Sequence, residues 1–487
     1  MRDVSRRDFI RNSGAALAGA GVVTTLRRSV WAQAAGANDR IRVAIVGVRK
    51  KGIEHIKYFR ELPGVQVAAL CDCDTQFLDL EVKKLKDQKV TVDTYVDFRR
   101  VLDDRNIDVV ILSIPDHWHG LATVWACQAG KHVYVEKPAT HNIWEGQRMV
   151  EAARKYNRVV GMGSQERSDT GLLAFAEHLK SGQLGKVRYA RAISYGLRET
   201  IGKVNGPQPI PATCDYSLFQ GPAPLTPLMR QNLHYDWHWC WSTGTGEIGN
   251  LGGHVLDDCR WILGLEDLPR RVISLGGRFG YDDDGETPNT QIAFYDYEKV
   301  PVIYEVRGMP AKQGANWEDQ YRGIRFGLVI QCENGYFAGG RGGGWTYDNN
   351  NKRLNQFPGD GGGTHYQNFI DAVRSGKREK LRAEMREGHL SAALCHMANI
   401  SYRLGRRQSV EEAARTVAGN DLLQETFERL MTHLQANAID LARTPLVVGP
   451  ALSWSNQAEK FQAEYGDWAN MLVRREYRPP FVVPEKV

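Results

Sequence analysis

The sequence predicts an α/β fold built from two domains. Its first half alternates apolar strands with helical stretches, which is the order of a parallel sheet covered by helices. Residues 41–47 are mostly apolar and end in glycine, the pattern of a strand buried on both faces. From about residue 161 the alternation becomes irregular and strands recur in hairpin-like pairs, which indicates a second, α+β domain.

The N-terminal segment is typical of a removable export signal. Ser5-Arg6-Arg7-Asp8-Phe9-Ile10 precedes an apolar stretch at residues 14–25, which is shorter than the roughly 20 residues that span a bilayer. Ala32-Gln33-Ala34 supplies a small-residue cleavage site. We therefore expect a periplasmic protein, exported folded by the twin-arginine pathway, with no membrane insertion after signal cleavage.

The next segment has the spacing of a dinucleotide-binding turn. Gly47 and Gly52 occupy the first and third glycines of G-x-G-x-x-G, and Arg49 replaces the second. A second strand at residues 65–71 runs into Asp72, where a carboxylate binds ribose hydroxyls. This predicts a Rossmann domain that binds NAD rather than NADP, since Asp72 repels a 2′-phosphate. An ordinary tight turn is the alternative, and Arg49 is a candidate contact to the pyrophosphate.

Two polar loops follow later strands of this domain. Strands are expected at residues 91–95, 109–114 and 132–135, and the last two run into Pro115-Asp116-His117-Trp118-His119 and Glu136-Lys137-Pro138. Both loops fall at the carboxyl edge of the parallel sheet, where the ligands of such folds bind. The candidate cofactor contacts in these loops are Pro115, His117, His119, Glu136 and Lys137.

The glycine turn, Asp72 and these two loops, above all Glu136-Lys137-Pro138 after a strand, resemble the glucose–fructose oxidoreductase / inositol dehydrogenase (Gfo/Idh/MocA) family. The resemblance extends to about residue 405. It implies a C-terminal domain with a large, open, mostly antiparallel sheet, whose outer face often makes the oligomer contact. It also implies a carbohydrate substrate and a homo-oligomer, either a dimer or a tetramer.

The second domain is expected to mix helices and hairpins. A helix is predicted at residues 172–180 and a strand at 186–194. Hairpins are predicted from residues 291–297 with 302–306, and around 323–337. The glycine-rich stretch 339–363 lacks a Gly-Lys-Ser/Thr ending, so it is expected to be a mobile hairpin loop rather than a phosphate cradle.

An aromatic segment at residues 234–241 is a candidate for substrate contact. Its aromatic residues alternate with polar ones, which in an extended chain places the two kinds on opposite faces. Aromatic faces stack on sugar rings, although packing of the tryptophans into the core is the alternative. The candidate substrate contacts here and just beyond are Tyr235, Trp237, His238 and Glu247. Histidines without convergent carboxylates or cysteines do not predict a metal site.

A helix around Asn250 carries the candidate catalytic residues. Asn250, His254 and Asp258 are spaced four residues apart and share one stripe of that helix. The family usually has Asp-x-x-x-His here, so Asn250 stands in the place of an acid and cannot take a proton. The resemblance implies that Lys137 hydrogen-bonds the reacting hydroxyl and that His254 accepts its proton, alone or with Glu247.

The C-terminal part is expected to be helical and then extended. Residues 387–406 have a core-facing apolar stripe, on which His389 and His396 are interpreted first as packing residues. Residues 409–441 are expected to be helical, and 475–484 to form a strap over the domains or a neighbouring subunit. The expected segments are a signal peptide at 1–34, the Rossmann domain at 38–160, the second domain at 161–405 and the tail at 406–487.

Composition excludes some classes of partner and framework. The 487 residues carry a formal charge of +6, of which +4 falls in residues 1–34, and no dense Lys/Arg block follows. This disfavours a nucleic-acid partner. The eight cysteines contain no C-x-x-C pair, and folding before export predicts no obligatory disulfide framework.

Three functions are compatible with these features. The leading one is an oxidoreductase that transfers hydride between tightly bound NAD and a sugar, polyol or glycoside hydroxyl. The second is a redox-neutral, NAD-dependent glycosidase, which resembles the α-N-acetylgalactosaminidase branch of the family and suits a compartment without free NAD. The third is a sugar-binding protein without activity, which the retained Lys137 and His254 disfavour.

Overall fold

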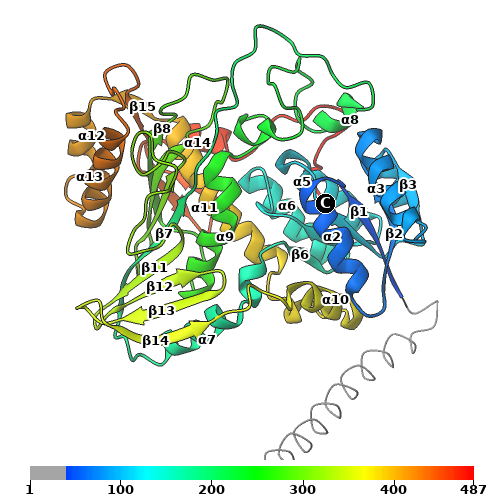
Figure 1. The fold of residues 1–487 in the computed structure, drawn as a ribbon, viewed down its shortest axis with the longest axis horizontal. Helices are drawn as coiled ribbons and strands as arrows, with labels where there is room; N and C mark the ends of the chain where they lie inside the picture. Colours follow the sequence, from blue (N-terminus) through cyan, green and yellow to red (C-terminus); the bar gives the residue numbers. More distant parts are fainter. Residues whose placement is uncertain (1–39) are drawn as a thin grey trace, which may run out of the picture.

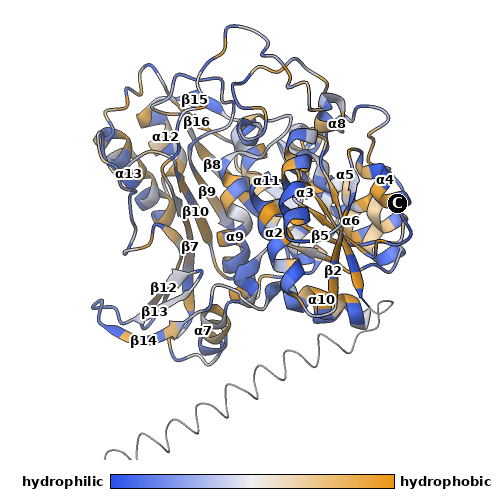
Figure 2. Cartoon of the chain, turned by 45° about the vertical axis from the view of Figure 1, so that its right-hand side comes forward, coloured by the Kyte–Doolittle hydropathy of each residue, from blue (hydrophilic) through white to orange (hydrophobic). Residues whose placement is uncertain are grey.

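The computed structural model describes residues 40–487, so the expected export signal at 1–34 lies outside the described residues. Figure 1 shows two sheets, with α9 and α11 between the large sheet and the first domain. Figure 2 shows hydrophobic residues gathered on the strands of both sheets. Within the described part of the chain, no helix has the length and apolar character needed to cross a membrane.

The first domain is a six-stranded parallel sheet in the order β3-β2-β1-β4-β5-β6. Its strands are β1 Ile41–Val46, β2 Val65–Cys71, β3 Asp93–Tyr95, β4 Val109–Leu112, β5 His132–Val135 and β6 Val160–Met162. Its helices are α2 Lys50–Glu61, α3 Thr75–Asp87, α4 Phe98–Asp103, α5 Asp116–Gln128 and α6 Ile143–Lys155. The predicted Rossmann fold is confirmed, and the expected domain boundary after residue 160 falls inside β6.

The second domain contains a mixed sheet of twelve strands. Ten follow the order β14-β13-β12-β11-β7-β10-β9-β8-β16-β15, and β17 pairs with β8 and β18. β7 and β10 run parallel, whereas the other neighbours run antiparallel, as the resemblance implied. The strands are β7 Val187–Tyr195, β8 Arg271–Gly277, β9 Thr290–Asp296, β10 Val302–Arg307, β11 Phe326–Cys332, β12 Tyr336–Gly340, β13 Gly343–Tyr347, β14 Arg353–Pro358, β15 Arg406–Gln408, β16 Leu446–Val448, β17 Leu452–Ser455 and β18 Lys460–Gln462.

Helices cover both faces of this sheet. The helical segments are η2 Gln165–Ser168, α7 Thr170–Lys180, α8 Tyr216–Gln220, η3 Asp236–Trp239, α9 Gly246–Ile262, α10 His365–Ser375, η4 Arg378–Lys380, α11 Met385–Arg403, α12 Val410–Val417, α13 Asp421–Ala436 and α14 Gly466–Met471. α9 and α11 pack in the core on the inner face, against residues such as Tyr295 and Tyr304. α12 and α13 pack on the opposite face against Phe294 and Ile303, so the tail covers part of the outer face.

The glycine-rich stretch corrects one prediction. Instead of a mobile loop, residues 339–363 contain the end of β12 and all of β13 and β14. Their glycines permit close strand packing, since a Cβ on Gly343 would lie 1.8 Å from the Phe357 carbonyl oxygen. Glycine here serves the approach of one backbone to another.

The aromatic segment is also not the extended strand that its alternation predicted. Residues 236–239 form the 3₁₀ helix η3. The chain folds back on itself after η3, where the Thr243 hydroxyl and the Gly244 N–H donate to the carbonyls of Trp237 and Cys240. Because this segment is not extended, its aromatic side chains do not share one face.

The C-terminal tail is helical where predicted, but it also adds β15–β18 to the large sheet. Its last residues pack on the first domain, with Phe481, Val483 and Val487 in the same apolar core as β4 and α5. The Arg478 guanidinium donates to the carbonyls of Ser217 and Gly221. The tail thus joins the first domain to the long connection between β7 and α9.

Candidate active site

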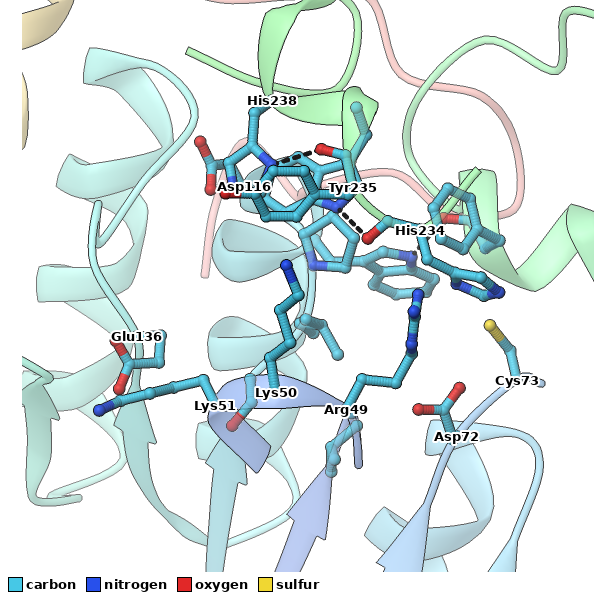
Figure 3. A pocket seen from close by; sticks show the side chains of 18 of the residues that line it. Arg49, Lys50, Lys51, Asp72, Cys73, Asp116, Glu136, His234, Tyr235 and His238 are labelled. Carbon is cyan, nitrogen blue, oxygen red and sulfur yellow. Dashed lines mark hydrogen bonds between the residues drawn. The ribbon is translucent and has the colours of Figure 1, made fainter. Parts of the chain in front are cut away.

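A pocket of about 450 Å³ opens at the carboxyl edge of the parallel sheet, between the two domains. Figure 3 shows Arg49 and Lys50 extending from the turn after β1 towards Tyr235 and His234 of the second domain. In the same view Glu136 lies on one side of Arg49 and Lys50, near Lys51, and Asp72 lies on the other side, near Cys73. The pocket combines a dinucleotide-binding half with a half that carries ionisable groups.

The turn after β1 fits a dinucleotide. Gly47 has φ +83°, and a Cβ there would lie 2.4 Å from the Ser113 carbonyl oxygen. A Cβ on Gly52 would lie 1.9 Å from the Gly47 carbonyl oxygen, so only glycine permits this tight entry into α2. The Asp72 carboxylate accepts the N–H groups of Val48 (2.9 Å) and Asp74 (3.0 Å), which fixes it at the end of β2 in the pocket wall. This chain therefore has the backbone cradle and the ribose-binding acid that NAD requires.

Arg49 and Lys50 take different directions from this turn. The Arg49 guanidinium lies 4.1 Å from the centre of the Phe77 ring, and burial lowers its pKa although Asp72 and Asp74 oppose that effect. Arg49 therefore lies towards the Asp72 end of the pocket. The Lys50 ammonium lies 3.6 Å from the centre of the Tyr235 ring and so links the turn to the second domain.

The long connection between β7 and α9 covers the Asp72 end of the pocket. The Thr75 N–H donates to the Thr213 carbonyl (2.9 Å), and the Asp215 N–H donates to the Cys73 carbonyl (2.8 Å). His234 contacts the Asp74 carboxylate at 2.8 Å. These bonds from α3 and its preceding turn hold the second domain over the place where an adenosine would lie.

Lys137 lies at the other half of the pocket, directly against α9. Its Nζ donates to the Asn250 backbone carbonyl (2.7 Å) and to the Asn250 side-chain oxygen (3.1 Å). Gly253 permits this approach, since a Cβ there would lie 3.1 Å from the Lys137 Cβ. Burial lowers the pKa of Lys137, against the opposing effect of neighbouring carboxylates. The ammonium thus loses its proton more readily than an exposed lysine does.

His254 is held by a carboxylate that sequence reasoning missed. Its Nδ1 lies 2.9 Å from Oε2 of Glu166 in η2. Burial opposes ionisation of Glu166, but His254 beside it lowers the pKa of this carboxyl to about 2. Within residues 40–487 the Nε2 of His254 has no hydrogen-bond partner, and the residue lines the pocket. A carboxylate on one ring nitrogen leaves the other nitrogen available to a substrate proton.

Two further carboxyl groups line this half of the pocket. Burial raises the pKa of Asp116 to about 7, even though the Thr245 hydroxyl donates to it at 2.8 Å. Burial also opposes ionisation of Glu136, yet the hydrogen bond from His55 (2.9 Å) brings its pKa down to about 2. Asp116 therefore titrates near neutrality while Glu136 stays ionised, which is the separation expected of groups with different tasks.

Three of the four candidate substrate residues line the pocket, and Glu247 does not. Tyr235, Trp237 and His238 line the pocket, and the His238 ring stacks on Trp237 with 3.6 Å between centres. Burial lowers the pKa of His238 to about 3, and its Nδ1 bonds the Tyr235 carbonyl. Glu247 lies elsewhere, because it is buried against Arg198 (2.9 Å) and Trp239 (3.1 Å) and does not line the pocket. This geometry corrects Glu247 from a substrate contact to a partner of Arg198.

His117 and His119 also lie outside the pocket wall. His117 bonds the carbonyls of Phe219 (2.9 Å) and Thr243 (3.2 Å), and burial lowers its pKa to about 3. His119 bonds the carbonyls of Ile114 (2.8 Å) and Pro138 (2.7 Å). Both histidines hold neighbouring loops together, so they support the cofactor loop without touching the pocket. Pro115, in contrast, lines it.

Part of this site was predictable from the sequence. The side-chain oxygen of Asn250, which was not expected to take a proton, accepts a hydrogen bond from Lys137, and Glu247 pairs with Arg198 instead of assisting His254. The pocket includes several residues that were not predicted as site residues, among them Lys50, Lys51, Asp116, Gln165 and Arg341, and Glu166, which contacts His254, was not predicted either. Asp116 stands in a loop already singled out, whereas Glu166 has no spacing that relates it to His254. Among residues 40–487, no group of His, Cys, Asp and Glu side chains is arranged to hold a metal ion.

Comparison with protein families agrees with this geometry. Residues 41–164 match the model of the oxidoreductase family with an NAD-binding Rossmann fold, and residues 189–296 match the model of its C-terminal alpha/beta domain. The chain belongs to the Gfo/Idh/MocA family. NAD is the cofactor of this family's first domain, which matches the fit of the turn after β1 and of Asp72.

Curated relatives of this Gfo/Idh/MocA protein carry glycosidase names. A glycosyl hydrolase family 109 protein from Shewanella baltica (strain OS185) is 27% identical over 212 residues, which is 39% of this chain and 46% of the relative. An alpha-N-acetylgalactosaminidase from Shewanella oneidensis is 25% identical over 225 residues, 42% of this chain and 49% of the relative. The chain thus matches about half the length of these relatives.

Solved structures share the fold. The WlbA dehydrogenase from Bordetella pertussis, in complex with NADH and UDP-GlcNAcA, has a TM-score of 0.53 and 18% identity, covering 75% of this chain and 97% of that one. A levoglucosan dehydrogenase in complex with NADH has a TM-score of 0.54 and 15% identity, covering 74% and 97%. At these identities the similarity establishes the architecture of this family member.

Proposed function

We propose that this protein is an oxidoreductase that transfers hydride between a sugar, polyol or glycoside hydroxyl and tightly bound NAD. The observation that supports it most is the placement of Lys137 and the His254–Glu166 pair at one end of a pocket whose other end fits NAD. When bound, NAD supplies the acceptor for the hydride. The protein must then bind the alcohol, orient it and take its proton.

Lys137 and His254 divide that work. The Lys137 amine hydrogen-bonds the reacting hydroxyl and holds its oxygen, with its direction set by the two oxygens of Asn250. The Nε2 of His254 accepts the hydroxyl proton, because Glu166 fixes the Nδ1 side of the ring. Asn250 and Glu166 are positioning residues in this scheme.

Retention of the cofactor is the second part of the proposal. The connection between β7 and α9 covers the Asp72 end of the pocket, and Arg478 of the tail binds that connection from outside. Opening the pocket therefore requires several hydrogen bonds from separate segments to break together. Retained NAD would suit a periplasmic enzyme exported by the twin-arginine pathway, which we propose from the sequence of residues 1–34.

A redox-neutral glycosidase is the second candidate. The curated relatives that carry glycosidase names favour it, although their alignments span about half of each relative. Transient oxidation of a hydroxyl acidifies the neighbouring C–H, whose removal lets the glycosidic oxygen leave. Addition of water and reduction of the ketone then complete hydrolysis without net oxidation. His238 is a candidate for C–H proton removal, because it is neutral and lines the pocket.

One experiment separates the two candidates. Protein purified with its own cofactor is incubated with aryl glycosides, free sugars and polyols, without added NAD. A ketosugar with stoichiometric reduced cofactor supports the oxidoreductase, and catalytic release of phenol supports the glycosidase. Absence of dinucleotide from the denatured protein would refute the retained-cofactor proposal.

We also propose a homo-oligomer, either a dimer or a tetramer. Apolar residues of the outer sheet face around Ile193, Val329 and Tyr336 form a cluster separate from the one that α12 and α13 cover. Light scattering on the purified protein measures the oligomeric state, and a monomer at all concentrations would refute this proposal.

A further inference from the structure

The glycine-rich hairpin brings a charged side chain to the reaction half of the pocket. Arg341 lies in the turn between β12 and β13 and lines the pocket together with Lys137, Asn250 and His254. The family resemblance did not single out this arginine, and the proposed mechanism does not use it. Its position therefore needs a separate explanation.

A buried carboxylate fixes the turn that carries Arg341. Asp169, which is fully buried, accepts the N–H groups of Gly342 (2.9 Å) and Gly361 (2.7 Å) through one oxygen. Gly342 has φ +94° and Gly343 has φ +92°, conformations that favour glycine. The turn is thus defined by its backbone and by a charge-assisted anchor, and it places Arg341 at a set position on the pocket rim.

Within residues 40–487 the Arg341 guanidinium has no acidic partner. Its Nε donates to the Gly361 carbonyl at 3.1 Å, which leaves the two terminal nitrogens as a fork. No carboxylate of residues 40–487 lies within ion-pair distance of it, whereas Glu166 contacts His254 and Glu136 contacts His55. Its charge is nevertheless among those that lower the pKa of Glu166, so Arg341 lies on the same side of the pocket as the His254–Glu166 pair.

We propose that Arg341 binds an oxyanion group on the substrate, the carboxylate of a uronic acid or a sulfate ester, and so selects acidic sugars. The inference rests on the proposed function, since it places the sugar beside Lys137 and His254. A guanidinium fork matches both oxyanions in two parallel hydrogen bonds. The acidic side chains at this end are engaged by His254, His55 and Thr245, so the unpaired cation favours a negative ligand.

Binding to the cofactor-loaded protein tests this inference without relying on turnover. Methyl glucuronide, methyl glucoside 6-sulfate and methyl glucoside are titrated by calorimetry into wild type, Arg341→Gln and Arg341→Lys. Arg353→Gln is the matched control, because Arg353 lies on β14 of the same sheet, stacks on Trp345 and does not line the pocket. Cofactor content is measured in every sample.

Wild type is expected to bind one of the two anionic sugars about 10- to 100-fold more tightly than methyl glucoside. That preference should be lost in Arg341→Gln, be partly kept in Arg341→Lys, weaken with salt and persist in Arg353→Gln. Whether the carboxylate or the sulfate is preferred identifies the source of the oxyanion. Equal binding of charged and neutral sugars, or a preference that survives Arg341→Gln, would overturn the inference, as would loss of NAD from Arg341→Gln.

Failure of the proposed oxidoreductase activity can be distinguished from failure of the role proposed for Arg341. Preferential binding of an anionic sugar that is neither oxidised nor cleaved would support the role of Arg341 and refute the proposed activity. Turnover of neutral sugars with no anionic preference would support the activity and refute the role of Arg341.

Discussion

Replacement of Asp116 by asparagine should remove a pH-dependent loss of stability. Burial raises the pKa of this carboxyl from 3.8 to about 7. That difference corresponds to about 4 kcal/mol between the neutral and ionised forms, an upper bound because local opening admits water. Asparagine keeps the size and the hydrogen bond with Thr245 but has no charge at any pH.

The direction in which stability changes with pH follows from proton linkage. A carboxyl whose folded pKa is raised contributes stability below its unfolded pKa, and that contribution is lost as pH rises through the folded pKa. Wild type should therefore lose stability relative to Asp116→Asn between about pH 4 and pH 7. The variant should match wild type near pH 4 and be more stable by about 1–4 kcal/mol at pH 8.

Denaturant unfolding of the cofactor-loaded proteins at both pH values measures this difference. Asp79→Asn is the control, since Asp79 is exposed on α3 and its side chain makes no hydrogen bond to any residue of the described part of the chain. It should leave the pH dependence unchanged. If Asp116→Asn and wild type differ by the same amount at pH 4 and pH 8, the raised pKa of Asp116 is wrong.

Three other substitutions test the site. Lys137→Ala should lower kcat by about 10²- to 10⁴-fold with unchanged NAD content, and normal turnover would remove Lys137 from the mechanism. Glu166→Gln should lower kcat about 10-fold or more with little change in KM, because it loosens His254, whereas a change in KM alone would contradict a positioning role. Asp72→Ser should admit NADP, as measured by the dinucleotide released on denaturation, and continued exclusive retention of NAD would show that discrimination lies elsewhere.

The first domain was predictable because its signals are local. Gly47, Gly52 and Asp72 have fixed places relative to β1 and β2, and backbone geometry dictates each of them. The apolar strands and the loops that follow them are likewise read from consecutive residues. Position along the chain was therefore enough to place Lys137 in the pocket.

The second domain was harder because its determinants are not local. The many glycines of residues 339–363 predicted a mobile loop from the sequence. The close approach of Gly343 to Phe357 shows that they permit the pairing of β13 with β14. The alternation of residues 234–241 predicted a strand, but residues 236–239 form η3, after which the Thr243 hydroxyl and the Gly244 N–H donate to the carbonyls of Trp237 and Cys240. Neither contact is visible in hydrophobic periodicity.

The effect of Asn250 on the catalytic half of the pocket could be determined only from the structure. The sequence shows that Asn250 stands where the resemblance implies an acid. The effect of this change on the site depends on which side chain contacts Asn250. The side-chain amide oxygen accepts from Lys137 without supplying a negative charge, so burial remains the leading effect on the Lys137 pKa and lowers it. An aspartate in that place would favour the ammonium form and oppose this effect.

A carboxylate contacts His254 in this site, although position 250 carries an amide. Glu166 reaches His254 from η2, 88 residues away in sequence, and its carboxylate pairs with Nδ1 of the ring. The resemblance implies an acidic residue at position 250 on the helix stripe, whereas in this chain the carboxylate that contacts His254 comes from Glu166 of η2. Burial lowers the pKa of Lys137 although Glu166 is among the carboxylates that oppose this effect, and the contact with Glu166 orients His254 to accept a proton.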